Sequence, residues 1–552
     1  MFNSTPMKLL VILETLVFWV SAASSVSTTF SNAIQYQFDT DGNAIDLTSG
    51  KVDWLGGAYV WYGLPFGCGK DFCGVATYSS TNLRTWHYNG LLFDPNTPEI
   101  EILCGATLSG SCGRPHIIYS AINNNYILWV DAQTPGYAIF TSNFPTGGFV
   151  RSQNRALVGY QPAGPFKAGD FSVHVINGTG YIAYALLDFS TTGASIWPPF
   201  LQSLYVQRLT PDMRNTTSTA YHVLTNSDLV DMQAESPDIF KRGDYFYITA
   251  SNTCGFCTGT LLVVYRSENI SGPWIRQIIS SDTCGGQTTG VLTLPAPNSG
   301  ATSYIHSADL FRTAPIVGTR TATHGHQFQK LEFKSDGSLK DLDCSLSKSV
   351  TVSLTSGTGV SDPMLGRAVS ATDGSGEIES YAASCNLPYY QLYQTWKSSK
   401  SGKLTEVGVN IAGVAPTGNL TITIFRYDND TNFFTPRYIW ETLTTFNLVP
   451  SNTSQSLQVV RVPVGKAVKQ GDRLGMALVS GSITPMCTLV KGGGKNSGSD
   501  VMGNVYDRTS DNGNGRTLFA NGPGQVSLRG KNGKTPPIRT LDQEIKWYAT
   551  VN

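Results

Sequence analysis

The chain has 552 residues, more than a single hydrophobic core usually organises, so two domains are expected. Charged residues make up only 14%, and 39 basic residues balance 39 acidic ones, which leaves no net charge to attract a polyanion. Because the sequence also has no long run of Lys or Arg, these values argue against nucleic-acid binding. The 56 Gly, 25 Tyr and 25 Phe residues are typical of a turn-rich secreted β protein.

Residues 1–25 predict a secretory signal peptide. Lys8 precedes an apolar stretch from Leu9 to Val20, and the small residues Ser21 to Ser25 follow it. A membrane anchor is the alternative, but the stretch is short and Glu14 interrupts it. We therefore expect a secreted, extracellular protein with no membrane partner.

One strand pattern recurs five times between about residue 45 and residue 340. Each copy has a short apolar strand, a turn, an aromatic strand, and a further strand that ends at a Gly or Trp turn. The spacing of about 50 to 70 residues suits blades of four strands. The pattern therefore predicts a five-bladed β-propeller over residues 30–343. The copies contain, in turn, Gly56, Arg114, Asp170, Glu235 and Gln287.

A Ser/Thr-rich stretch over residues 343–358 ends the repeats and predicts a linker. New strands follow, for example at Leu404–Ile411, Leu420–Tyr427 and Leu457–Val464, with almost no helical periodicity. They predict a β-sandwich accessory domain over residues 359–552, with carbohydrate binding as one role open to it. The predicted fold class is all-β: a five-bladed β-propeller followed by a C-terminal β-sandwich.

All ten cysteines follow the predicted signal peptide, as expected for an oxidising compartment. The disulfide connectivity stays open, although the pairs Cys68–Cys73 and Cys104–Cys112 would form local loops. The pair Cys254–Cys257 has the spacing of a redox site or of half a zinc site, but without a second such pair a loop staple is favoured. Asn-x-Ser/Thr sequons predict a glycoprotein, and they begin at Asn177, Asn215, Asn269, Asn419, Asn429 and Asn452.

Three polar residues open predicted innermost strands: Asp170, Glu235 and Gln287. The innermost strands of a propeller converge on one axis, so these residues are expected to line one pocket. Glu235 precedes an apolar strand, where burial would raise its pKa and keep it protonated at neutral pH. The alternative is that Glu235 caps a strand in a surface loop.

Several motifs carry a resemblance to a known family. They are Asp39–Asn43 with Gly57–Gly63, Arg114–Tyr119 with Leu128 and Trp129, and Glu235–Pro237 with Phe240, Lys241, Gly243 and Tyr245. Their order and spacing over about residues 35 to 340 resemble glycoside hydrolase family 43, in its branch of galactan exo-1,3-β-galactosidases.

The resemblance implies a glycosidase that acts on galactan or arabinogalactan-like cell-wall polysaccharide with inversion. Glu235 would be the general acid, and Asp170 would tune its pKa and orient it. Gln287 matches a glutamine that stands near the expected base. We expect a polysaccharide or oligosaccharide substrate, no cofactor or metal, and a monomer.

The chain also departs from this branch. Gly113 and Leu64 stand where glutamates are usual, and Thr48 falls where a histidine is common. Asp46 and Asp53 lie nearby but out of register with the expected base, so no base is evident. An enzyme impaired by its missing acidic residues is one outcome, and a non-catalytic, lectin-like carbohydrate-binding protein is the alternative.

Further residues have two interpretations each. Arg114, Trp61 and Trp129 are expected to contact substrate, although aromatic residues at strand centres more often belong to a core. Three histidines could bind a metal or line the axis, but without acidic companions at ligand spacing a core or solvated role is favoured. An aromatic cluster in the C-terminal half could bind sugar or pack on the first domain. These two groups are His306, His324 and His326, and Tyr389, Tyr390, Tyr393 and Trp396.

Overall fold

The computed structural model describes most of the chain from residue 27 onward, so the predicted signal peptide lies outside the described residues. The described ranges are 27–105, 112–132, 135–191, 201–224, 228–294, 303–311, 322–345, 348–355, 373–374, 381–384, 390–413, 418–427, 439–480, 486–492, 516–521, 538–541 and 543–552. Within them the regular structure is almost entirely strand, with one α-helix, α1 (Pro98–Cys104). No helix in these ranges is long and apolar enough to cross a membrane. The all-β prediction is therefore confirmed.

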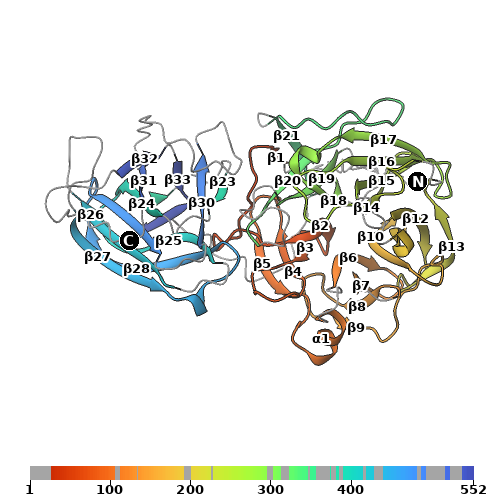
Figure 1. Ribbon diagram of the computed structural model, residues 1–552, viewed down its shortest axis with the longest axis horizontal. Coiled ribbons are helices and arrows are strands. Elements are labelled where there is room, and N and C mark those ends of the chain that lie inside the picture. The colour runs from red at the N-terminus through yellow and green to blue at the C-terminus, as the bar shows by residue number, and fades with distance from the viewer. Residues whose placement is uncertain are drawn as a thin grey trace, which may run out of the picture.

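Five antiparallel sheets follow one another in chain order through the described parts of residues 48–330 (Figure 1). Four of them contain four strands and the fifth contains three, and the strands of each sheet pair in sequence order. The first strands of neighbouring sheets contact each other. The first strand of the fifth sheet also contacts that of the first sheet, so the five sheets close a ring.

The strands of the ring have the following bounds. Sheets one and two contain β2 (Thr48–Leu55), β3 (Ala58–Leu64), β4 (Ala76–Ser80), β5 (His87–Leu91), β6 (Gly113–Ser120), β7 (Asn125–Asp131), β8 (Ala138–Ser142) and β9 (Val150–Arg151). Sheets three to five contain β10 (Phe166–Ile176), β11 (Thr179–Asp188), β12 (Leu201–Leu209), β13 (Thr216–His222), β14 (Ala234–Arg242), β15 (Tyr245–Asn252), β16 (Leu262–Ser267), β17 (Ile275–Ser280), β18 (Gln287–Leu294), β19 (Ser303–Leu310) and β20 (Gly325–Lys330).

Apolar side chains fill the space between every pair of neighbouring sheets in the ring. Val60 and Leu128, for example, join the first two sheets in one buried cluster, and Trp61 and Leu292 join the first sheet to the fifth. Each sheet is therefore covered on both faces. Burial of apolar surface contributes about 25 cal/mol per Å², so these clusters are the main force that closes the ring.

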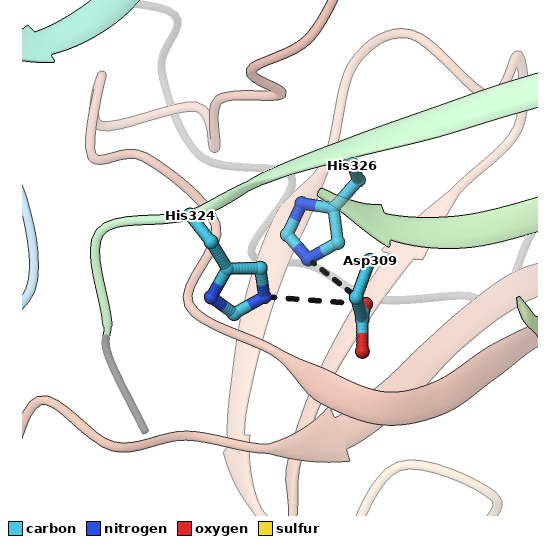
Figure 2. Close-up of side chains that lie close together, drawn as sticks. All are labelled: Asp309, His324 and His326. Carbon is cyan, nitrogen blue, oxygen red and sulfur yellow. Dashed lines mark ion pairs between the residues drawn. The ribbon is translucent and has the colours of Figure 1, made fainter. Parts of the chain in front are cut away.

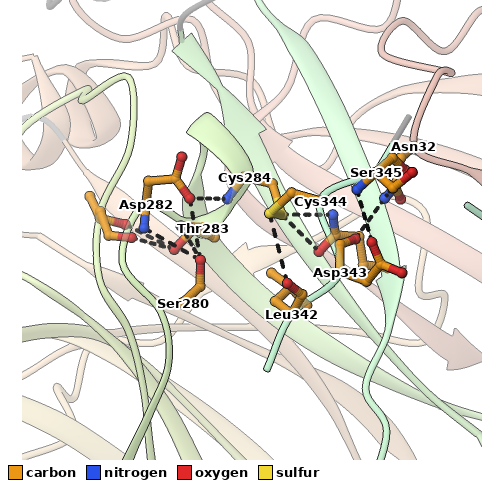
Figure 3. The surroundings of a disulfide bond; sticks show 11 residues. Asn32, Ser280, Asp282, Thr283, Cys284, Leu342, Asp343, Cys344 and Ser345 are labelled. Atoms are coloured by element: carbon orange, nitrogen blue, oxygen red, sulfur yellow. Dashed lines mark hydrogen bonds between the residues drawn. A yellow bond between two sulfur atoms is a disulfide. The ribbon is translucent and has the colours of Figure 1, made fainter. Parts of the chain in front are cut away.

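A disulfide and a strand pair hold the ends of the ring together (Figure 3). Strand β1 (Ser27–Ser31) pairs with β21 (Ser349–Ser353), which follows the fifth sheet. Cys284 is bonded to Cys344, and the Asn32 amide donates to the carbonyl of Asp343 at 2.8 Å. The chain that enters the ring and the chain that leaves it are thus fixed to each other.

The other disulfides agree with the local loops expected from the sequence. Cys68 is bonded to Cys73, Cys104 to Cys112, and Cys254 to Cys257. Cys487, in the second half of the chain, is also disulfide-bonded. No cysteine in the described structure is free.

The second half of the chain forms a seven-stranded and a six-stranded sheet, both antiparallel. Their inner faces share one apolar cluster, in which the rings of Trp396 and Trp547 lie 4.4 Å apart. Trp396 is 1% exposed and belongs to this core, whereas Tyr389 lies outside the described residues. The strands are β22 (Asp373–Gly374), β23 (Tyr381–Ser384), β24 (Tyr390–Lys397), β25 (Gly402–Gly413), β26 (Leu420–Tyr427), β27 (Ile439–Leu448), β28 (Gln458–Val468), β29 (Arg473–Ser480), β30 (Met486–Gly492), β31 (Arg516–Asn521), β32 (Ile538–Leu541), β33 (Gln543–Ile545) and β34 (Trp547–Val551).

The two halves meet at the chain segment that precedes the first sheet. The Asn410 side chain donates to the Gly42 carbonyl at 2.9 Å, and the Val459 amide donates to Asn43 Oδ1 at 2.9 Å. An apolar cluster that includes Tyr36 and Leu457 lies beside these bonds. The second half therefore packs on the outside of the ring.

Candidate active site

Each innermost strand of the ring has a register irregularity near its first residues. Such bulges redirect side chains away from the regular alternation of a strand and are frequent beside active sites. At three of them a residue other than glycine has positive φ: 56° at Ser49, 45° at Arg114 and 53° at Ser236. That conformation is costly for these residues and persists only where the surrounding structure enforces it. Polar side chains gather at this end of the ring.

Glu235 lies on the bulge of β14 and is only 9% exposed. Its Oε1 accepts hydrogen bonds from the Cys254 backbone amide at 2.8 Å and from Gln287 Nε2 at 3.0 Å. Its Oε2 accepts from Gln202 Nε2 at 3.0 Å. Burial, and then the nearby Asp170 carboxylate, raise the pKa of Glu235 to about 8. These two effects outweigh the hydrogen bonds from Cys254 and Gln202 and the charge of Arg114, which lower the pKa.

Asp170 and Gln287 lie on the two innermost strands that flank β14. Asp170 Oδ2 accepts from the Ser236 hydroxyl at 2.9 Å and from the Ser236 amide at 3.2 Å. Gln287 Nε2 donates both to Glu235 and to the Cys254 carbonyl, the latter at 2.8 Å. The three residues expected to line one pocket therefore lie together, and Glu235 is not on the outer rim of the ring.

The sequence did not reveal two of the groups that position Glu235. Gln202, at the start of β12, also donates to Thr253 Oγ1 at 3.0 Å and so connects the third sheet to the Cys254 loop. The backbone of Cys254 contacts both Glu235 and Gln287, and the Cys254–Cys257 disulfide closes this loop. The Cys254–Cys257 disulfide was expected only to close a local loop. It also fixes the backbone amide of Cys254, which donates to Glu235.

Arg114 is 4% exposed, and its charge acts on two carboxyl groups at this end of the ring. It lowers the pKa of both Glu235 and Asp309, although burial leaves both values raised. Its Nη2 donates to the Pro237 carbonyl at 3.3 Å. Its Nε is buried and has no hydrogen-bond partner in the described structure.

The structure does not place Trp61 and Trp129 where a sugar would stack. Trp129 is 0% exposed, donates to the Met213 carbonyl, and packs in the cluster between sheets two and three. Trp61 is 4% exposed and meets Trp86 edge-on in the cluster between sheets one and five. Both are core residues, so neither ring presents an exposed face on which a sugar could stack.

Two histidines do have an acidic companion, contrary to the expectation from the sequence (Figure 2). Asp309 on β19 lies opposite His326 on β20, and its Oδ1 is 3.9 Å from the Nε2 atoms of both His326 and His324. The backbone amide of Ser49 donates to Asp309 Oδ2 at 2.9 Å. Burial raises the pKa of Asp309 to about 6 and lowers that of His326 to about 3. His306 lies apart, buried, with Nε2 2.8 Å from Thr288 Oγ1.

The donor atoms of Asp309, His324 and His326 lie within 4.8 Å of one another and are of the kinds that divalent metal ions take. The carbonyl oxygen of Leu47 also lies 3.0 Å from His324 Nε2 and 2.7 Å from His326 Nε2. This carbonyl can only accept, so in this geometry both Nε2 atoms carry protons and are not available to a metal.

A buried ion pair joins the innermost strands of the first and fourth sheets. Lys51 is 1% exposed, and its Nζ lies 3.1 Å from Asp238 and 3.5 Å from Asp53. Asp53 also accepts from the Tyr62 hydroxyl, and Asp46 accepts from the backbone amides that follow Pro65. Asp46 and Asp53 are thus both occupied by neighbouring groups.

No family model matches this chain, and no curated protein matches it. Solved structures similar to it include an exo-β-1,3-galactanase from Clostridium thermocellum, with 18% identity over 95% of this chain and 100% of that chain, at a TM-score of 0.46. A galactose complex of an exo-β-1,3-galactanase from Phanerochaete chrysosporium has 16% identity over 83% and 99% of the two chains, at a TM-score of 0.44. A family 43 β-1,3-galactosidase with galactodeoxynojirimycin has 20% identity over 56% and 97%, at a TM-score of 0.44.

We predict that a chelator leaves the stability of the protein unchanged. The Leu47 carbonyl already accepts from both imidazoles, so the His324–His326–Asp309 group needs no ion. Thermal unfolding of the purified protein with and without EDTA measures this. A midpoint that falls by several degrees with EDTA and recovers with Zn²⁺ would show instead that the group holds a metal.

Proposed function

We propose that this protein is a secreted glycoside hydrolase that cleaves galactan or arabinogalactan-like cell-wall polysaccharide with inversion. The observation that carries the proposal is the Glu235 carboxyl, buried with a pKa of about 8 beside Asp170 at the bulged end of the ring. A carboxyl that keeps its proton at neutral pH and is held by three fixed donors is suited to general acid catalysis. The resemblance of the surrounding motifs to family 43 supplies the substrate class.

We interpret the five sheets as the blades of a five-bladed β-propeller over residues 30–343, and the two later sheets as a β-sandwich over residues 359–552. The closed contacts of the innermost strands support the first interpretation, and the shared apolar cluster of the two sheets supports the second. Secretion is supported by the sequence of residues 1–25 and by the disulfides. The described sequon asparagines, which are all exposed, are compatible with glycosylation: Asn177, Asn215, Asn269, Asn419 and Asn452.

In this mechanism Glu235 transfers its proton to the leaving glycosidic oxygen as the bond to the anomeric carbon breaks. The resulting carboxylate accepts the hydrogen bonds from Gln202, Cys254 and Gln287, which are stronger to a charged acceptor. The donors are therefore in place before charge develops, and no reorganisation is needed. Asp170 raises the pKa of Glu235 in the resting state and keeps the proton on it.

Inversion also needs a water molecule on the opposite face of the sugar and a group that accepts its proton. Gln287 directs its Nε2 at Glu235 and Cys254, which leaves the Oε1 carbonyl to orient a water. An amide carbonyl is a very poor base, so we expect slow turnover. The alternative function, a carbohydrate-binding protein without activity, is favoured by the missing acidic groups at Gly113 and Leu64.

Replacement of the acid tests the proposed function. Glu235→Gln is expected to lower the rate on galactan by a factor of about 10² to 10⁴, as for loss of a positioned general acid. The loss is expected to be much smaller for aryl galactosides with a good leaving group, because these need little protonation. Reducing-sugar release and aryl release are measured on the same preparations. Glu99→Gln, on an exposed glutamate of α1, is the control.

Equal losses on galactan and on activated substrates would show that Glu235 binds the sugar and does not donate a proton.

Installing a carboxylate separates the enzyme from the binding protein. A Cβ added at Gly113 would meet nothing within 4 Å, so the backbone at this position has room for the first carbon of a side chain. We predict that Gly113→Glu releases galactose faster than the wild type, whereas Gly113→Gln, of the same size but without a base, does not. If wild type and Gly113→Glu both bind galactan fragments and neither releases sugar, the protein is a binding protein.

A further inference from the structure

A cavity lies at the end of the first two sheets that is opposite to the candidate active site. It has a volume of about 540 Å³, within the range of ordinary small-ligand pockets. We call it the far-face pocket, and define it by its lining residues Trp54, Leu55, Gly56, Tyr119, Asn124, Tyr126 and Asn143.

The strand directions separate this pocket from the candidate active site. Arg114 lies at the start of β6, and Tyr119 lies near the end of the same strand. The five steps along the strand from Arg114 to Tyr119 correspond to about 17 Å at about 3.3 Å per residue. Trp54 and Leu55 similarly end β2, whose start carries Ser49. A sugar at Glu235 therefore does not reach the far-face pocket without a chain that passes around the ring.

The far-face pocket is lined by aromatic rings and amides, without a charged side chain among its lining residues. Tyr119 is 39% exposed, and its ring centroid lies 5.1 Å from that of Tyr126. Trp54 is held edge-on against Tyr59, with ring centroids 4.8 Å apart. The rings are thus fixed by neighbours before any ligand arrives, which reduces the entropy cost of binding.

Hydrogen-bonding groups are also presented in a fixed way. The Tyr119 hydroxyl donates to Asn124 Oδ1 at 2.5 Å, which orients the amide and leaves its Nδ2 hydrogens for another acceptor. Gly56 has a φ of 60°, and a Cβ there would meet Tyr126 Oη at 3.2 Å and Pro145 Cγ at 3.1 Å. Glycine at this position keeps the pocket open beside the tyrosine hydroxyl.

Two exposed apolar side chains lie close in sequence to residues that line the pocket. Ile122 is 69% exposed in the turn between β6 and β7, and Phe144 is 67% exposed directly after the lining residue Asn143. Both belong to loops that also carry lining residues, Asn124 and Asn143. Exposed apolar surface often belongs to a site that binds a ligand or another protein.

We propose that the far-face pocket is a second carbohydrate-binding site that takes a segment of a neutral glycan. Tyrosine and tryptophan rings offer an apolar face and a polar tip, which suit the apolar face and the hydroxyls of a pyranose. Asn124 and Asn143 supply donors and acceptors for those hydroxyls. The uncharged lining favours a neutral sugar over an anionic glycan or a charged peptide. The choice of galactan as the glycan rests on the proposed function.

The test counts binding sites for galactan-derived oligosaccharides by calorimetry. All proteins carry Glu235→Gln, so the ligand is not consumed. Tyr119→Ala in this background is expected to lose one oligosaccharide site per chain, and its retardation in a galactan-containing native gel is expected to fall several-fold. Trp54→Phe, which keeps a ring, is expected to retain the site. Tyr88→Ala, on β5, removes an equally exposed tyrosine (44%) outside the pocket and is expected to bind as its parent does.

Equal site counts in the Tyr119→Ala and Tyr88→Ala proteins, both with unchanged unfolding midpoints, would overturn the proposal. Binding of an anionic glycan in preference to galactan oligosaccharides would overturn the choice of a neutral ligand. The outcome is separable from that of the proposed function. Sugar release by the wild type tests the hydrolase, and the number of oligosaccharide sites tests the far-face pocket, so either can fail alone.

Discussion

Three N–H groups point at the carboxyl of Glu235, and each comes from a different part of the ring. Gln202 begins an outer strand of the third sheet, the Cys254 amide belongs to a loop of the fourth, and Gln287 begins the fifth. Their convergence requires these three sheets to keep their relative positions within a few tenths of an ångström. The apolar clusters between sheets and the Cys284–Cys344 disulfide supply that rigidity. The chemistry at Glu235 therefore depends on the closure of the whole ring.

The bulges in the innermost strands bring polar side chains together at one end of the ring. A regular strand would alternate its side chains between two covered faces, and both faces of each sheet are buried here. The bulges at the starts of the five innermost strands break this alternation and turn polar groups toward the open end. Positive φ at Ser49, Arg114 and Ser236 is the conformational cost. The buried Lys51–Asp238 pair below them neutralises charge that would otherwise lie unpaired in the core.

The sequence predicted the strands and the grouping of Asp170, Glu235 and Gln287, because strand spacing and the first position of each repeat are local features. It could not place Trp61 and Trp129. Alternation of polar and apolar residues along a strand normally distinguishes a face in solvent from a face in the core. Here both faces of the sheets are covered by neighbouring sheets, so this pattern gives no information. It also missed Gln202, Asp309 and the role of Cys254. Their contacts run between strands or sheets, and depend on a register and on loop paths that local patterns do not encode.

The central claim is that burial keeps a proton on Glu235 at neutral pH. Carbon-13 labelling of the glutamate carboxyls, followed by NMR titration of wild type against Glu235→Gln, isolates the signal of this one group. Burial and Asp170 disfavour its charged form, so the account predicts a carboxyl that stays protonated up to a pKa of about 8 and ionises above it. A Glu235 carboxyl that ionises near 4.5, the ordinary value for glutamate, would contradict the account.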